Sequence, residues 1–121
     1  MNHKSNFFLI DLLNILPIEI ELFIQAPSLM NVVIEKMLKA SDQHYFKSVQ
    51  FDELIKKEFV GEELKSSFSV YIQNIEIKKN GILLFKGYDG VEYGVISKKI
   101  SIPVWFKEKY VPEICLISAD W

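Results

Sequence analysis

The residues from Phe68 to Pro103 read FSVYIQNIEIKKNGILLFKGYDGVEYGVISKKISIP, and this stretch decides the fold of the chain. Apolar and polar residues alternate along it with a period of two, which is the pattern of strands that bury one face. Two dipeptides, Asn80-Gly81 and Asp89-Gly90, interrupt the alternation. Both favour type I′ turns, because such turns need a positive φ at each central residue. The stretch therefore predicts three antiparallel strands joined as a meander over residues 68–102.

Apolar residues spaced three and four apart predict two helices near the start of the chain. The first covers residues 7–16, with Ser5 or Asn6 as its N-cap. The second covers residues 29–38 and begins after Ser28, whose hydroxyl can cap it. Both helices are rich in apolar side chains, and we expect them to pack against the sheet.

Shorter elements lie between these helices and the meander. Residues 18–24 begin with strand-like alternation and are interpreted as a strand, although the sequence also allows a helix there. The aromatic-rich residues 44–51 predict another strand. Asp52 then caps a helix over residues 53–59, and Gly61 is predicted to end it in the left-handed conformation.

The end of the chain predicts a short helix over residues 104–110 and a last strand over 114–118. The terminal Trp121 is expected to fold back onto the core or to touch a partner. Residues 1–121 are thus expected to form a single domain of the α+β class. Its sheet is mostly antiparallel, built from the 68–102 meander and the last strand, and packed against the N-terminal helices.

Charge is distributed unevenly along the chain. All fourteen basic residues are lysines, against sixteen acidic residues. Residues 1–64 hold six lysines and ten acids, whereas residues 65–121 hold eight lysines and six acids. Arginine supplies the bidentate fork that reads base edges, so its absence argues against sequence-specific nucleic-acid binding. The acidic first half suits a protein partner with a basic surface.

A basic patch with interleaved tyrosines is the alternative that would bind nucleic acid. Stacking of bases on aromatic side chains beside lysines is how single-strand binders work. Lysines near strand edges also prevent edge-to-edge pairing, however, and we predict no nucleic-acid partner. The residues in question are Tyr71, Lys78, Lys79, Lys86, Tyr88, Tyr93, Lys98 and Lys99.

No pattern in the sequence predicts catalysis, a cofactor or a metal site. The metal-binding residue types His3, His44 and Cys115 are far apart in the chain, and no glycine-rich phosphate loop precedes a helix. An enzyme built on His44 would require this side chain beside a carboxylate or Cys115 in an open cleft. We therefore predict that the protein is not an enzyme.

The same features predict a cytoplasmic protein. A single cysteine forms no intramolecular disulfide, which is typical of a reducing compartment. The apolar run at residues 7–16 is interrupted by Asp11 and Asn14, and it is too short to span a bilayer. We predict no membrane association, and a monomer or a weak dimer.

The last third of the chain carries a resemblance to a known family. The residues that carry it are Phe85 to Gly94, Ser97-Lys98, Ile102-Pro103, Phe106, Lys109-Tyr110, Cys115 and Ser118 to Trp121. In these residues the chain resembles the C-terminal half of small bacterial immunity proteins of contact-dependent inhibition and other polymorphic toxin systems. The resemblance implies a cytosolic antitoxin encoded beside a toxin. Such a protein binds the C-terminal toxin domain, often a basic nuclease, and blocks its active site.

Acidic and aromatic residues are the candidate contacts with such a toxin, since complementary charge speeds association. The candidates on the third helix and the turn after it are Asp52, Glu53, Glu58, Glu62 and Glu63. Those at the second hairpin are Tyr88, Asp89, Glu92 and Tyr93. The competing hypothesis is a small-ligand-binding or adaptor domain without catalytic activity. It predicts a concave pocket lined by Tyr71, Phe85 and Tyr93.

Overall fold

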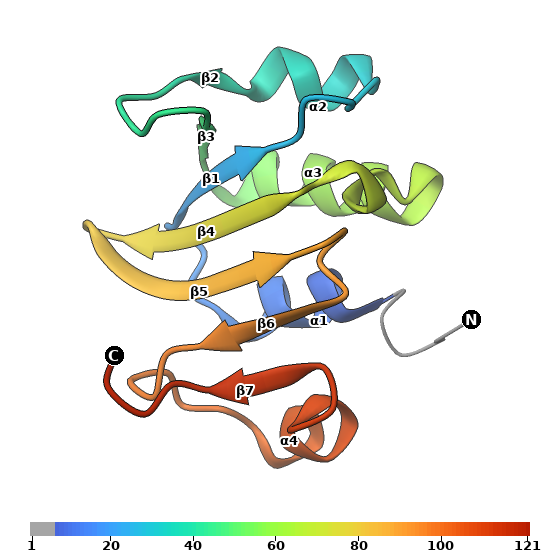
Figure 1. Cartoon of the computed structure of the whole chain (residues 1–121). Helices are drawn as coiled ribbons and strands as arrows, with labels where there is room; N and C mark the ends of the chain where they lie inside the picture. Colours follow the sequence, from blue (N-terminus) through green and yellow to red (C-terminus); the bar gives the residue numbers. More distant parts are fainter. Residues whose placement is uncertain (1–6) are drawn as a thin grey trace.

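Residues 7–121 are described by a computed structural model, in which seven strands form one sheet (Figure 1). The strand order is β2-β3-β1-β4-β5-β6-β7, and every neighbouring pair is antiparallel except β6 and β7, which are parallel. The strands are β1 (Glu21–Gln25), β2 (Lys39–Ala40), β3 (Lys47–Gln50), β4 (Asn74–Lys79), β5 (Ile82–Tyr88), β6 (Tyr93–Ile96) and β7 (Cys115–Ile117). The predicted α+β class and mostly antiparallel sheet are confirmed.

The helices leave one face of the sheet open. They are α1 (Phe8–Ile15), α2 (Val32–Met37), α3 (Glu53–Ser66) and α4 (Val104–Tyr110), with a 3₁₀ helix η2 (Phe68–Tyr71). Figure 1 shows α1 and α3 behind the strands, while no described helix crosses in front of β4, β5 and β6. We call the face toward α1 and α3 the inner face and the opposite one the outer face.

Buried aliphatic and aromatic side chains fill the space between the inner face and the helices. Leu22 of β1 lies opposite Ile77 of β4, which lies opposite Phe85 of β5, and all three are buried. From α1, Phe8 reaches this layer and its ring lies 5.8 Å from that of Phe85. Alternate residues of these strands therefore point into one core.

The predicted meander is confirmed in strands β4, β5 and β6, and its first turn has the predicted form. Asn80 and Gly81 have φ angles of 51° and 79°, which are the positive values of a two-residue type I′ turn. The second connection is longer than predicted, because four residues separate the paired Tyr88 and Tyr93. Val91 of this loop is buried, and its contact with the core explains why the turn is longer than the predicted two residues.

The predicted ends of the meander are wrong. Residues 68–71 form η2 rather than strand, because Phe68 and Ser69 are both buried directly after α3. The third strand ends at Ile96 and not at residue 102. There Ser97 Oγ accepts a hydrogen bond from the backbone N–H of Lys99 at 3.1 Å, which begins a turn.

The third helix is longer than predicted. Asp52 caps it as expected, and its Oδ1 accepts a hydrogen bond from Ile55 N–H at 2.8 Å. The helix then passes through Gly61 and ends at Ser66, so Glu62 and Glu63 lie in the helix rather than at a turn. The left-handed residue is Ser67, with φ 51°, and its N–H bonds to the carbonyl of Glu63.

The second helix begins later than predicted. Its cap is Asn31, whose Oδ1 accepts a hydrogen bond from Ile34 N–H at 3.0 Å, and not Ser28. Leu29 is buried before the helix starts, so its apolar contact belongs to the preceding loop. The first helix occupies residues 8–15, close to its predicted range, while its predicted caps Ser5 and Asn6 lie outside the described residues.

The two short predicted strands are present with different limits. Strand β1 confirms the interpretation of residues 18–24 as a strand, displaced toward the C-terminus, and the helical alternative is wrong. Strand β3 begins at Lys47 instead of residue 44. A turn precedes it, in which Phe46 N–H bonds to the carbonyl of Gln43 at 3.0 Å and Tyr45 has a φ of 69°.

The C-terminal elements follow the prediction closely. Helix α4 has the predicted range, and β7 occupies residues 115–117 at the edge of the sheet. Trp121 folds back onto the chain, with its N–H bonded to Ser118 Oγ at 2.9 Å and its carbonyl accepting a bond from Lys98 N–H at 2.9 Å. Its side chain is half-buried.

Candidate partner-binding surface

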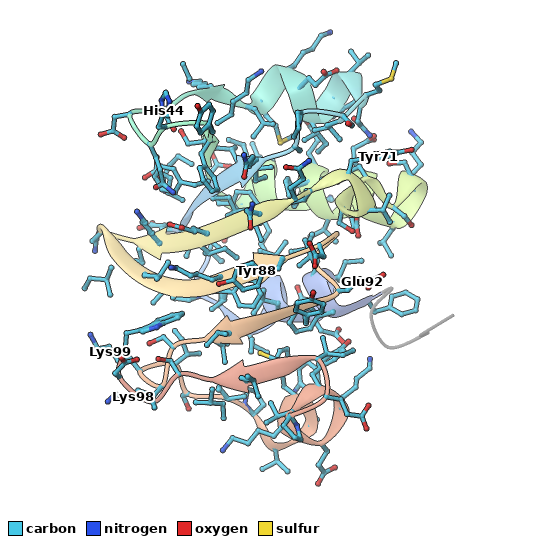
Figure 2. All side chains as sticks on the ribbon, viewed as in Figure 1. His44, Tyr71, Tyr88, Glu92, Lys98 and Lys99 are labelled. Carbon is cyan, nitrogen blue, oxygen red and sulfur yellow. The ribbon has the colours of Figure 1, made fainter. Side chains whose placement is uncertain are left out.

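The predicted hairpin residues lie together on the outer face. Tyr88 and Tyr93 are directly opposite each other across β5 and β6, with ring centroids 6.4 Å apart. Their row continues through Asn74 of β4 to Gln25 of β1, and Asn74 Nδ2 donates to Gln25 Oε1 at 2.7 Å. Figure 2 shows Tyr88 in the middle of the strands, on the side away from the helices. The strand register therefore holds both phenol rings in exposed positions.

A hydrogen bond within the hairpin fixes one tyrosine and one acid. Tyr93 Oη donates to Asp89 Oδ2 at 2.5 Å. This bond, with the nearby negative charge of Asp89, raises the pKa of the Tyr93 phenol above its usual value of 10.0. The phenol therefore stays a proton donor throughout the physiological range, and Asp89 stays oriented beside it.

The 3₁₀ helix η2 supports this hairpin from the side. The loop N–H groups of Asp89 and Gly90 donate to the carbonyls of Gln73 and Ile72, at 3.0 and 2.7 Å. A Cβ on Gly90 would lie 3.3 Å from the carbonyl oxygen of Val70, so the two backbones are in close contact. Tyr71, exposed at the end of η2, is thereby brought to the same end of the sheet as Glu92 (Figure 2).

These contacts define what we call the tyrosine–acid surface. It consists of Tyr71, Tyr88, Asp89, Glu92 and Tyr93, all exposed. The sequence predicted four of the five as partner contacts. From the sequence, Tyr71 is expected only in the alternative stacking patch or ligand pocket. Its place here depends on the hydrogen bonds from the loop to residues 72 and 73, for which the sequence has no local signal.

The predicted acidic residues of α3 do not join this surface as a group. Asp52 and Glu53 lie at the start of the helix, and fourteen residues at 1.5 Å each place them about 20 Å from its end. Glu58 is exposed midway. The Glu62 side chain is only 15% exposed, because Oε1 accepts a hydrogen bond from Asn31 Nδ2 at 3.1 Å and Oε2 lies 3.8 Å from Lys65 Nζ.

Glu63 is not available to a partner, because its side chain is buried. Its Oε1 accepts a hydrogen bond from Ser69 N–H at 3.0 Å, and its Oε2 accepts one from Ser69 Oγ at 2.5 Å. The carboxylate thus ties the end of α3 to η2. Burial raises the pKa of Glu63 above its usual value of 4.5, although the bonds from Ser69 act in the opposite direction.

We predict that Glu63→Gln changes the dependence of stability on pH. Because the folded state raises the pKa of Glu63, it holds this proton more tightly than the unfolded chain does. The stability from this group is fully present below the unfolded pKa and is lost as pH rises through the folded pKa. Glutamine carries no titrating charge, so the stability of the variant relative to the wild type is expected to increase as the pH rises above the unfolded value of 4.5.

Urea unfolding at a series of pH values measures this difference. Glu108→Gln is the control, because Glu108 is exposed on α4, away from Glu63, and its replacement is expected to change stability by less than about 0.5 kcal/mol. The prediction is contradicted if the difference in unfolding free energy between Glu63→Gln and the wild type does not change with pH, or if it grows in favour of the wild type as the pH rises.

The structure does not bring His44 to a catalytic partner. His44 is exposed in the loop between β2 and β3, with its ring centroid 3.9 Å from that of Tyr45. Cys115 belongs to β7 at the opposite edge of the sheet and is buried, and burial raises the pKa of its thiol to about 12. Among residues 7–121, no group of three or more histidine, cysteine or acidic side chains is placed to hold a metal ion.

The ligand pocket of the competing hypothesis is not formed, and the residues of the alternative basic patch do not gather in one place. Phe85 points into the core from the inner face, whereas Tyr93 lies on the outer face, so the two do not line one cavity. Lys78 donates to Gln43 Oε1 at 3.1 Å and lies 3.8 Å from Glu76. Figure 2 places Lys98 at the far end of the sheet from Tyr71.

Comparison of the chain with protein-family models, with curated proteins and with solved structures returned no match. Of the helices within residues 7–121, none combines the length and the apolar character that crossing a membrane requires.

Proposed function

We propose that this protein is an immunity protein that binds a toxin domain and blocks its active site in the cytoplasm. The tyrosine–acid surface is the observation that carries the proposal. It presents Tyr88 and Tyr93 on a sheet face that no described helix crosses, with the exposed side chains of Tyr71, Asp89 and Glu92 at the adjoining end of the sheet. All of these residues except Tyr71 belong to the segment in which the chain resembles immunity proteins.

The side chains of this surface suit recognition of a basic cleft. Tyrosine offers a large contact area with only two rotatable side-chain bonds, so little conformational entropy is lost on binding. Asp89 and Glu92 add negative charge beside the rings, which steers a basic nuclease toward the surface and disfavours acidic partners.

Rigidity adds to the affinity expected from these contacts. The loop is bonded to residues 72 and 73, and Tyr93 is bonded to Asp89, before any partner arrives. A pre-ordered surface loses less side-chain and loop entropy on association. The inhibitor is therefore expected to bind with little change of its own shape.

We predict that Tyr88→Ala weakens binding of the toxin domain encoded beside this protein by about thirtyfold or more, as expected for a central aromatic anchor. Glu92→Gln is expected to act differently, by slowing association several-fold at low salt with a small effect on dissociation. Surface plasmon resonance with the purified toxin domain, at two salt concentrations, measures both effects.

Tyr45→Ala is the control for this experiment, because Tyr45 is exposed in the loop between β2 and β3, outside the tyrosine–acid surface. Its affinity is expected to equal that of the wild type. If the wild-type protein forms no complex with the toxin domain and does not protect cells that express it, the proposed function is wrong. If Tyr88→Ala binds the toxin domain as tightly as the wild type does, the tyrosine–acid surface is not the binding site.

A further inference from the structure

Helix α3 exposes an apolar stripe on the side turned away from the sheet. It contacts the core through buried Phe59. At 3.6 residues per turn, Leu54, Lys57, Gly61 and Leu64 lie on the opposite side of the helix. The two leucines are 79% and 63% exposed. Successive positions of this stripe, residues 54, 57, 61 and 64, are three or four residues apart, which is the spacing of a helix-pairing seam.

Gly61 lies in the middle of this seam, at a position where its own chain does not require a glycine. A Cβ built on Gly61 meets no other atom within 4 Å, and its φ is not in the left-handed region. Glycine inside a helix is about 1 kcal/mol less favourable than alanine. A residue without a side chain at this position lets another backbone approach the helix closely.

The charges beside Gly61 fit a second copy of the same helix. Glu58 precedes Gly61 by three residues and Lys65 follows it by four, and both lie on the same side of the seam. A two-fold axis beside Gly61 sets two copies of α3 antiparallel. It places Glu58 of each copy opposite Lys65 of the other, so the favourable pair forms twice. Lys65 Nζ lies 3.8 Å from Glu62 Oε2 of its own chain, but its side chain is 78% exposed, so in a dimer it can exchange this weak pair for one with Glu58 of the second copy.

The other side of the seam is also self-complementary. Lys57 precedes Gly61 by four residues and Leu64 follows it by three, so the same axis lays the aliphatic stem of Lys57 along Leu64 of the second copy. A groove of about 500 Å³ runs here between α3 and the end of α1. Its lining includes Ile18, Val60 and Leu64, which provide an apolar floor for the second helix.

We propose that α3 forms a weak, two-fold symmetric homodimer through Leu54, Lys57, Glu58, Gly61, Leu64 and Lys65. The occupant of the groove is a second copy of this chain, because the charge pattern around Gly61 is complementary to itself. The dimer assigns Glu58 to this interface and not to the toxin. It leaves Tyr88 and Tyr93 free, since their side chains lie on the outer face of the sheet and α3 lies on the inner side.

Charge exchange tests the two-fold pairing directly, without a toxin. Sedimentation equilibrium between about 10 µM and 1 mM covers the affinity range of weak self-association. It is expected to show the 14.1 kDa chain approaching twice that mass. Glu58→Lys alone and Lys65→Glu alone each set two like charges against each other, and each is expected to weaken the dimer by about tenfold. An equal mixture of the two variants restores both opposite-charge pairs, and we expect it to regain wild-type dimerisation.

A second variant separates dimerisation from folding. Gly61→Glu adds a side chain whose Cβ meets no other atom of its own chain, and it raises helix propensity. In the dimer, however, the two introduced glutamates would meet at the two-fold axis. The variant is expected to be folded and monomeric at about 1 mM, a concentration at which even weak pairs associate. Lys107→Glu on the exposed side of α4 is the control and is expected to dimerise like the wild type. A wild-type chain that stays monomeric throughout, or a mixture no stronger than the single variants, overturns the proposal.

Discussion

Phe8→Ala is expected to reduce the free energy of unfolding by about 4 kcal/mol, the typical cost of removing a buried ring. Phe8 of α1 is fully buried, and its ring centroid lies 5.8 Å from that of Phe85, 6.0 Å from Phe106 and 5.0 Å from Tyr110. One side chain thus joins α1 to β5 and α4. Because its neighbours belong to separate elements, they cannot close the cavity without moving a helix off the sheet.

Urea unfolding, monitored by circular dichroism, measures this loss. Phe7→Ala is the adjacent control, because Phe7 is half-exposed and its replacement is expected to change stability by less than about 0.5 kcal/mol. Phe8→Leu keeps most of the volume and is expected to fall between the two. A Phe8→Ala protein as stable as Phe7→Ala would mean that α1 is not anchored through this ring.

The meander could be predicted from sequence because its signals are local. Period-two alternation and the Asn80-Gly81 turn both depend on neighbouring residues, and both are confirmed. The second turn depends on more distant contacts. Val91 follows Asp89-Gly90 and is drawn into the core, which lengthens the loop to four residues. No local rule distinguishes such a buried loop residue from the first residue of a strand.

The end of α3 was mispredicted for a similar reason. Glycine in the left-handed conformation often follows a helix, so the sequence predicts a helix over residues 53–59 that Gly61 ends. The helix instead ends where Ser67 adopts the left-handed conformation and Glu63 bonds to Ser69. A buried carboxylate paired with a serine six residues later is a tertiary feature, and the sequence shows it only as one more acidic residue in a charged helix.

The candidate site was partly predictable. Tyr88 and Tyr93 flank a predicted turn, so their closeness follows from strand pairing alone. Tyr71 joins them only because η2 packs beside the loop, through bonds between residues sixteen and eighteen positions apart in the chain. The acidic residues of α3 were grouped by composition. The helix disperses them, since neighbours in sequence point in different directions around its axis.

Gly94→Ala is expected to destabilise the fold by about 3 kcal/mol, at the upper end of the range for overpacked sites. A Cβ on Gly94 would lie 2.4 Å from the carbonyl oxygen of Lys86 and 2.4 Å from Cζ of Phe85. The Phe85 ring is fully buried, so it cannot rotate away from the added Cβ without contacting other core side chains. The Lys86 carbonyl belongs to strand β5, which pairs with β6 at this position, so relief of the contact requires the two strands to separate.

The chain offers a graded set of controls for Gly94→Ala in the same unfolding measurement. A Cβ on Gly87, which pairs with Gly94, would lie 2.7 Å from side-chain atoms of Ile75 and Phe85. Side chains yield more easily than backbone, so Gly87→Ala is expected to cost less. Gly61→Ala meets no neighbouring atom and is expected to stabilise the chain by about 1 kcal/mol through helix propensity. If Gly94→Ala reduced the free energy of unfolding less than Gly87→Ala and Gly61→Ala do, β5 and β6 would not be packed as closely as the structure shows. Phe85 would then not cover the two glycines directly beneath the tyrosine–acid surface.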